Sequence, residues 1–104
     1  MIVWRVENAR GNGPYYEDAL SPKERPHCPS PMKDGLGGKT PWPRDPIFGF
    51  ASREDLYAWF HDSMARLYRE GFRIKTFKVD PEDVLIGKRQ LCFSRTSAIE
   101  TEGD

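Results

Sequence analysis

The side chains with the clearest chemistry lie near the two ends of the chain. Arg5 and Glu7 alternate with apolar residues in the segment Ile-Val-Trp-Arg-Val-Glu, so they share one face of the strand that this alternation predicts. A guanidinium offers a two-pronged donor for phosphate or carboxylate, but a charge in a core strand can equally be held in a local ion pair. For Gln90, too, two interpretations stay open: its amide contacts a ligand or hydrogen-bonds a loop carbonyl.

Two further residues have types that suit catalysis. His27 can transfer protons near neutral pH or act as a local hydrogen-bonding residue. Ser52 could serve as a nucleophile beside His27 or His61, although a serine that precedes a helix is usually its N-cap. Cys28 and Cys92 with the two histidines match no zinc-site spacing, so we expect no metal site.

Common signatures of nucleotide and metal chemistry are missing from the sequence. It contains no phosphate-binding loop with its lysine, no Gly-x-Gly-x-x-Gly, no HExxH and no paired CxxC. Gly11-Asn12-Gly13 is too short for a phosphate cradle and indicates a turn. Motifs therefore point to no standard reaction.

Composition limits the broad class of protein. The chain has 104 residues, which suits one domain over 1–104 with a single modest core. Sixteen basic and sixteen acidic residues cancel, so no net field attracts nucleic acid or an anionic membrane. No apolar run approaches the roughly 20 residues of a membrane span. We expect a soluble intracellular protein with reduced cysteines.

The strongest structural signal runs from Phe48 to Gly71. It predicts a short buried strand leading into one amphipathic helix, capped by Ser52 and Asp55 at its start and ended by Gly71. The apolar stripe of this helix consists of Leu56, Trp59, Phe60, Met64, Leu67 and Tyr68.

A long segment over 8–46 has no regular period. It holds eight of the nine prolines and five of the nine glycines. A loop of this length inside a small domain is usually functional or disordered. Because aromatic and apolar residues are spaced along it, we predict an ordered excursion that folds back over the sheet as a flap, with a plain surface loop as the alternative. The anchoring residues would be Tyr15, Tyr16, Met32 and Trp42.

The remaining elements predict the fold class. A strand over 72–79 changes its apolar face midway, which indicates a bulge or a strand covered on both sides. Asp80 and Pro81 begin a turn, 84–86 is a short apolar run, 89–95 alternates as a last strand, and 97–104 reads as a frayed tail. One main helix on a small mixed or antiparallel sheet is an α+β domain.

Several short motifs, taken in order, resemble a family of small accessory proteins carried by tailed phages and prophages. The resemblance spans nearly the whole chain and rests on Arg5-Val6-Glu7, Gly11-x-Gly13-Pro14-Tyr15, His27 with Pro29, Pro31 and Asp34, Phe48-Gly49-Phe50-x-Ser52, Trp59-Phe60, Gly71-Phe72 and Gly87-x-x-Gln90. It implies a viral protein and no particular activity.

The sequence is more loosely similar to the ADP-ribosyltransferase superfold. That resemblance implies a basic residue on the first strand, an aromatic-small-serine strand and a late Gln or Glu, places that Arg5, Phe50-Ala51-Ser52 and Gln90 would fill. The chain is short for such an enzyme, and a glutamine cannot act as a general base.

Two function hypotheses follow, and we favour the first. In the first hypothesis, the chain is a phage protein that acts in the host cytoplasm and needs no cofactor. It binds and blocks a host defence or replication factor, for example as an anti-CRISPR protein. In the second, an NAD-binding transferase modifies a host protein. Gln90 and His27 would then be catalytic, with Arg5, Glu7, Tyr15, Asp34 and Ser52 as ligand-binding residues.

A nucleic-acid surface is possible from the basic residues of the second half but is not favoured, because strand alternation explains most of them as a solvated face. These residues are Arg69, Arg73, Lys75, Lys78, Lys88, Arg89 and Arg95.

Overall fold

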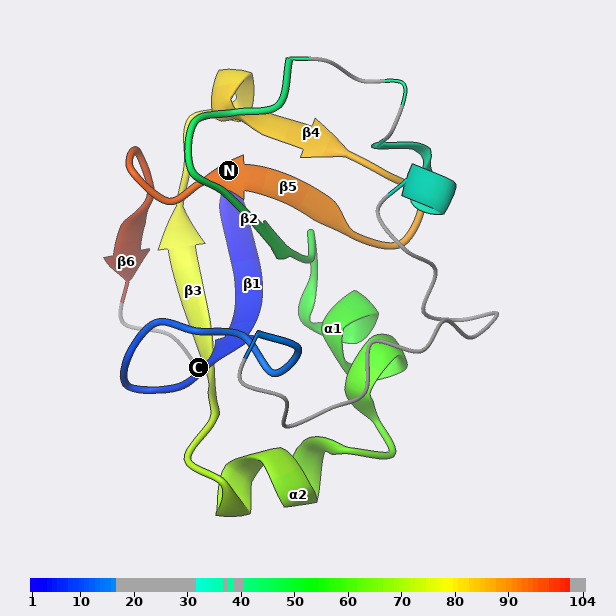
Figure 1. The fold of residues 1–104 in the computed structure, drawn as a ribbon, viewed down its shortest axis with the longest axis vertical. Helices are drawn as coiled ribbons and strands as arrows, with labels where there is room; N and C mark the ends of the chain where they lie inside the picture. The colour runs from blue at the N-terminus through cyan, green and yellow to red at the C-terminus, as the bar shows by residue number, and fades with distance from the viewer. Residues whose placement is uncertain (17–31, 37, 39–40, 102–104) are drawn as a thin grey trace.

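The fold is known from a computed structural model that describes residues 1–16, 32–36, 38 and 41–101. It contains two three-stranded antiparallel sheets with two short α-helices beside the first sheet (Figure 1). This arrangement confirms the predicted α+β class. That 1–104 forms a single domain stays a prediction.

The first sheet joins the two ends of the chain. Its strands are β1 (Ile2–Glu7), β3 (Arg73–Lys78) and β6 (Ile99–Thr101), in the order β1-β3-β6. The β1–β3 register runs without interruption from Ile2 opposite Lys78 to Glu7 opposite Arg73.

The second sheet is built from β2 (Pro46–Gly49), β5 (Leu91–Ser94) and β4 (Val84–Ile86), in the order β2-β5-β4. A 3₁₀ turn, η2 (Pro81–Asp83), precedes β4. Asp80 caps this turn by accepting the N–H of Glu82 at 2.9 Å, as the Asp-Pro sequence predicts.

The two sheets meet where β2 ends against β1. Trp4 and Phe50 exchange backbone hydrogen bonds of 2.8 and 2.7 Å across this junction. Gly49 lies just before it, and a Cβ there would stand 2.7 Å from the Trp4 carbonyl and 2.8 Å from Val3 Cγ1. The close crossing therefore requires glycine at this position.

Two hydrophobic clusters cover opposite faces of the β1–β3 pair. One packs Val6 and Phe72 against the helices, and the other packs Val3 and Phe77 against Phe93 of the second sheet. Since the register contains no bulge, the change of apolar face along 72–79 reflects a strand that is covered on both sides.

The prediction of one continuous helix over 52–71 is wrong, because the segment forms two helices. The segment forms α1 (Arg53–Phe60) and α2 (Met64–Arg69), separated by a tight turn in which Ser63 N–H bonds the Phe60 carbonyl at 2.7 Å. Breaking the helix lets both halves keep apolar residues in one cluster, namely Leu56, Phe60, Met64 and Leu67.

Both ends of this helical pair carry the predicted signals. Ser52 Oγ accepts the N–H of Asp55 at 3.1 Å and so caps α1. Gly71 has a φ of +92°, and the N–H groups of Gly71 and Phe72 return to the carbonyls of Tyr68 and Leu67. This is a Schellman cap at the end of α2.

The described parts of the excursion are fixed to the rest of the protein. Tyr15 accepts a 2.8 Å hydrogen bond from the indole of Trp59. Trp42 donates to the Leu36 carbonyl at 3.0 Å and packs edge-on against Phe48. These contacts confirm Tyr15 and Trp42 as anchors, whereas Tyr16 is 78% exposed and is not one.

Other expectations for the excursion and the tail have different outcomes. His27, Cys28 and the side chain of Met32 lie outside the described residues. The prediction of a frayed tail over 97–104 is wrong for Ile99–Thr101, which forms β6. This strand pairs with β3, and the hydroxyl of Thr101 contacts that of Thr76 on β3. A π-helical turn, η1 (Met32–Leu36), was not foreseen.

We predict that Gly49→Ala destabilises the protein by at least about 2 kcal/mol, because the new methyl group overlaps backbone and core atoms that have little room to move. Urea unfolding at neutral pH measures this change. Gly38→Ala is the matched control: its Cβ would meet nothing within 4 Å, so the effect should be neutral or mildly stabilising. Equal losses for the two variants would contradict the close crossing.

Candidate functional site

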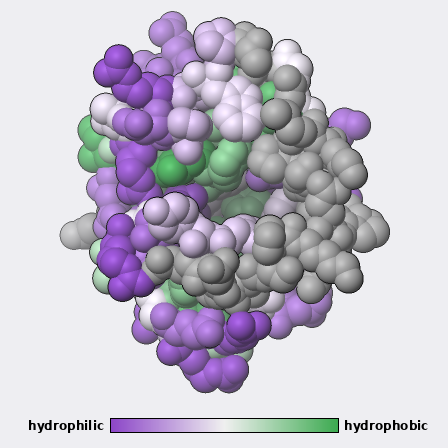
Figure 2. Space-filling model, in the orientation of Figure 1, coloured by the Kyte–Doolittle hydropathy of each residue, from purple (hydrophilic) through white to green (hydrophobic). Residues whose placement is uncertain are grey.

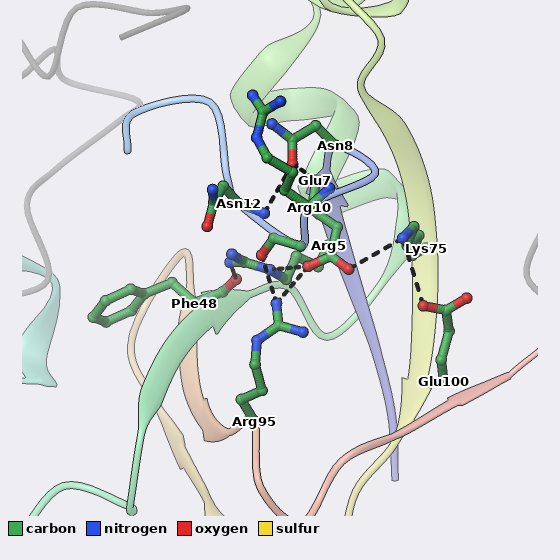
Figure 3. A network of polar contacts seen from close by, with 10 residues as sticks. Arg5, Glu7, Asn8, Arg10, Asn12, Phe48, Lys75, Arg95 and Glu100 are labelled. Atoms are coloured by element: carbon green, nitrogen blue, oxygen red, sulfur yellow. Dashed lines mark hydrogen bonds and ion pairs between the residues drawn. The ribbon is translucent and has the colours of Figure 1, made fainter. Parts of the chain in front are cut away.

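The main polar cluster is centred on the buried carboxylate of Glu7 (Figure 3). Arg5 Nε lies 2.8 Å and Arg95 Nη2 2.6 Å from its Oε2, and Lys75 Nζ lies 3.4 Å from its Oε1. Lys75 also reaches Glu100 at 3.6 Å. Three cations thus surround one carboxylate that is 1% exposed.

The cluster forms because the β1–β3 register and the end of β5 place its charged side chains close together. Arg5 is directly opposite Lys75 in the β1–β3 pair, and Glu7 follows two residues later on the same face. Arg95 comes directly after β5 and also donates to the Gly11 carbonyl at 2.8 Å. The cluster therefore connects the first strand, the third strand and the C-terminal part of the chain.

Arg5 ties β1 to β2 as well as binding Glu7. Its Nη1 donates to the Phe48 carbonyl at 2.7 Å, so two of its nitrogens serve internal contacts. Of the two alternatives left open by the sequence, the structure shows the local ion pair between Arg5 and Glu7. Ligand binding by these residues stays a prediction.

Burial and hydrogen bonding act in opposite directions on Glu7. Burial by itself raises the pKa of Glu7, but hydrogen bonds from Arg5 and Arg95 and their charges outweigh it and lower the pKa below the usual value. For Arg5, burial lowers the pKa, because it disfavours the charged guanidinium. The positive charge of Arg95 lowers this pKa further, whereas the hydrogen bond and the charge of Glu7 raise it. Glu7 is therefore an anion at neutral pH and a weak base.

The turn after β1 supports the cluster from its outer side. Asn8 Oδ1 accepts the N–H groups of Arg10 and Asn12, both at 3.0 Å. This presents the Gly11 carbonyl to Arg95, while a Cβ on Gly13 would stand 3.3 Å from Arg5 Nη2. The turn interpretation of Gly11-Asn12-Gly13 is confirmed.

A second polar cluster fixes the excursion to the β4–β5 connection. Asp34 is 1% exposed. Its carboxylate accepts the backbone N–H of Arg89 at 2.9 Å and that of Gln90 at 2.8 Å. The Asp34 carbonyl accepts the N–H of Lys88 at 2.9 Å. A Cβ on Gly87 would stand 2.5 Å from Asp34 Oδ2, so this turn closely surrounds the carboxylate.

The predicted site residues separate into different places. Arg5 and Glu7 belong to the first cluster, whereas Asp34 and the Gln90 backbone belong to the second. Gln90 precedes β5 and Arg95 follows it, so the two clusters lie toward opposite ends of that strand. Within the described residues no hydrogen bond or ion pair joins Arg5 to Gln90.

Ser52 and Tyr15 also have structural partners. Ser52 caps α1, and Tyr15 packs near Phe60 with a ring-centroid distance of 6.2 Å in addition to its bond with Trp59. The role of His27 stays a prediction, since it lies outside the described residues.

Sequence reasoning missed the parts that Lys75 and Arg95 play in the first cluster. Both were assigned to a solvated strand face on the basis of alternation. The available signal was Glu7 itself, because a carboxylate in a core strand needs compensating donors and Arg5 alone supplies only part of them.

An open pocket in the described part is lined by Asp55 and Ala58 of α1 and by Lys88 and Arg89. Figure 2 shows that the face of the molecule seen in Figure 1 is hollowed near its middle, with hydrophobic residues visible at depth. Cys92 lies buried in β5, where burial raises the pKa of its thiol to about 11. Among the described residues no helix is long and apolar enough to span a membrane.

The fold and the two clusters define a small α+β protein whose buried carboxylates, Glu7 and Asp34, serve internal contacts. A family model described as bacteriophage T4 Y00F protein matches residues 1–103. The chain therefore belongs to this phage protein family, which agrees with the phage resemblance of its motifs. Searches of curated proteins and of solved structures returned no match.

We predict that Glu7→Gln destabilises the protein by about 3 kcal/mol at neutral pH, because it leaves three cations without their shared anion. Since the folded-state pKa is lowered, the contribution of Glu7 is present above its unfolded pKa, near 4.5, and is lost as pH falls through the folded value. Urea unfolding at neutral and acidic pH measures both effects.

Glu100→Gln is the matched control for Glu7→Gln. Glu100 contacts the same Lys75, but its side chain is 56% exposed. We therefore expect Glu100→Gln to lower the free energy of unfolding by less than about 1 kcal/mol. A wild-type pH dependence that persists unchanged in Glu7→Gln would show that other groups dominate acid unfolding.

We predict that Asp34→Asn weakens the contact between the excursion and the β4–β5 turn by about 1–3 kcal/mol, because one acceptor oxygen becomes an amide donor facing N–H groups. Hydrogen exchange should become faster at the Arg89 and Gln90 amides. Asp62→Asn, on an exposed turn, is the control. Unchanged protection at these amides would contradict the assigned role.

Proposed function

We propose that this phage protein is a non-catalytic accessory protein that binds a host protein in the host cytoplasm. The observation that carries the proposal is the engagement of candidate ligand-binding groups in structural contacts. Arg5 and Glu7 stabilise the junction of three strands, Ser52 caps a helix, and Asp34 holds a turn.

The transferase alternative finds little support in this geometry. The Glu7 carboxylate is held by two arginines and is therefore a poor general base. Gln90 cannot supply a base, and its backbone belongs to the Asp34 cluster, apart from Arg5, which the transferase hypothesis takes as a ligand-binding residue. An enzyme of this kind would need these groups around one substrate.

Exposed apolar side chains favour a binding role. In the described part, large apolar residues on the surface include Ile2, Tyr16, Ile86 and Ile99. Such residues contribute to protein interfaces when they occur together. A host defence factor, including a CRISPR component, is the partner class that we favour for a phage accessory protein.

The proposal predicts that the tagged chain, produced in a bacterial host of such a phage, recovers a host protein that then re-forms a complex with the purified chain in size-exclusion chromatography. Purified chain should also show no rise in melting temperature with NAD.

The matched variant for the NAD measurement is Arg5→Gln. An NAD-dependent rise in melting temperature that this substitution removes, together with failure to reconstitute any host complex, would favour the transferase and overturn the proposal.

A further inference from the structure

A row of exposed side chains crosses the first sheet at its uncovered end. Ile2 on β1 is opposite Lys78 on β3, and Lys78 is opposite Ile99 on β6. Directly opposed residues share a face, so the three side chains are neighbours. Ile2 is 44% and Ile99 68% exposed; we call Ile2, Lys78 and Ile99 the open row.

The same face of the sheet is covered by helices farther along. Val6 and Ile74, which are also opposite each other, pack into the cluster formed with α1 and α2. Strand alternation places Ile2 and Val6 on one face, so helices cover one end of that face and leave the other end open.

We propose that the open row docks an amphipathic helix of a partner protein, which carries an acidic residue between two apolar ones. This inference rests on the proposed function and names the surface that serves it. A second helical layer over the open row would continue the layer that α1 and α2 begin.

The spacing of the open row suits a helix that crosses the strands. Adjacent strands lie about 4.8 Å apart, so Ile2 and Ile99 are roughly 9.6 Å apart across two strand intervals. Residues i and i+7 of a helix lie on one face and are separated by about 10.5 Å along its axis. Residue i+3 or i+4 then falls over Lys78.

Charge selects the kind of partner. Within the described residues Lys78 forms no ion pair, and it is exposed between the two isoleucines. A two-fold contact of the open row with a second copy would bring the two Lys78 side chains together, which is unfavourable. An acidic residue in the middle of the partner surface is complementary.

The test uses two synthetic helical peptides on an alanine-rich background. Both carry leucine at i and i+7, with glutamate at i+4 in one and lysine at i+4 in the other. In NMR titrations of the full chain, the glutamate peptide should shift the Ile2, Lys78 and Ile99 amides and bind about fivefold more tightly than the lysine peptide.

Charge reversal makes the expectation specific. Lys78→Glu should reverse the preference between the two peptides, whereas Lys88→Glu, on the β4–β5 turn, should leave it unchanged. Shifts centred on another surface, or no dependence on peptide charge, would overturn the docking surface. Recovery of a host complex that survives both Ile99→Asp and Lys78→Glu would overturn it too, while leaving the proposed function intact.

Discussion

One buried carboxylate connects parts of the chain that are far apart in sequence. Glu7 binds Arg5 from its own strand, Lys75 from β3 and Arg95 from the end of β5, and Arg95 also holds the turn at Gly11. Burying a carboxylate is costly unless its oxygens are paired, so these groups depend on one another. The same sheet face continues from this cluster into the apolar packing of Val3 and Phe77.

Local signals in the sequence were sufficient for much of the fold. The Ser52 cap, the Gly71 stop and the Asp80-Pro81 turn depend on a few neighbouring residues, and each is present as predicted. The shifted apolar pattern over 72–79 left a bulge and a strand covered on both faces as alternatives, and the structure has the second. Such features are readable because their physical cause lies within a few residues.

Features that depend on distant contacts were not readable. The break between α1 and α2 keeps both helices on one cluster, and β6 forms because β3 offers it an edge. Arg95 has no local sign that it will meet Glu7, 88 residues away. The transferase hypothesis needs Gln90 and Arg5 around one substrate, but strand register places them in separate clusters.

We assign the Glu7 cluster to structure and propose that binding takes place on the outer surface. The most direct test of this claim is a double-mutant cycle on the free energy of unfolding with Glu7→Gln, Arg95→Gln and the double variant. A structural cluster predicts a coupling energy of about 1.5–3 kcal/mol. Additive losses, with a coupling below about 0.5 kcal/mol, would contradict the account.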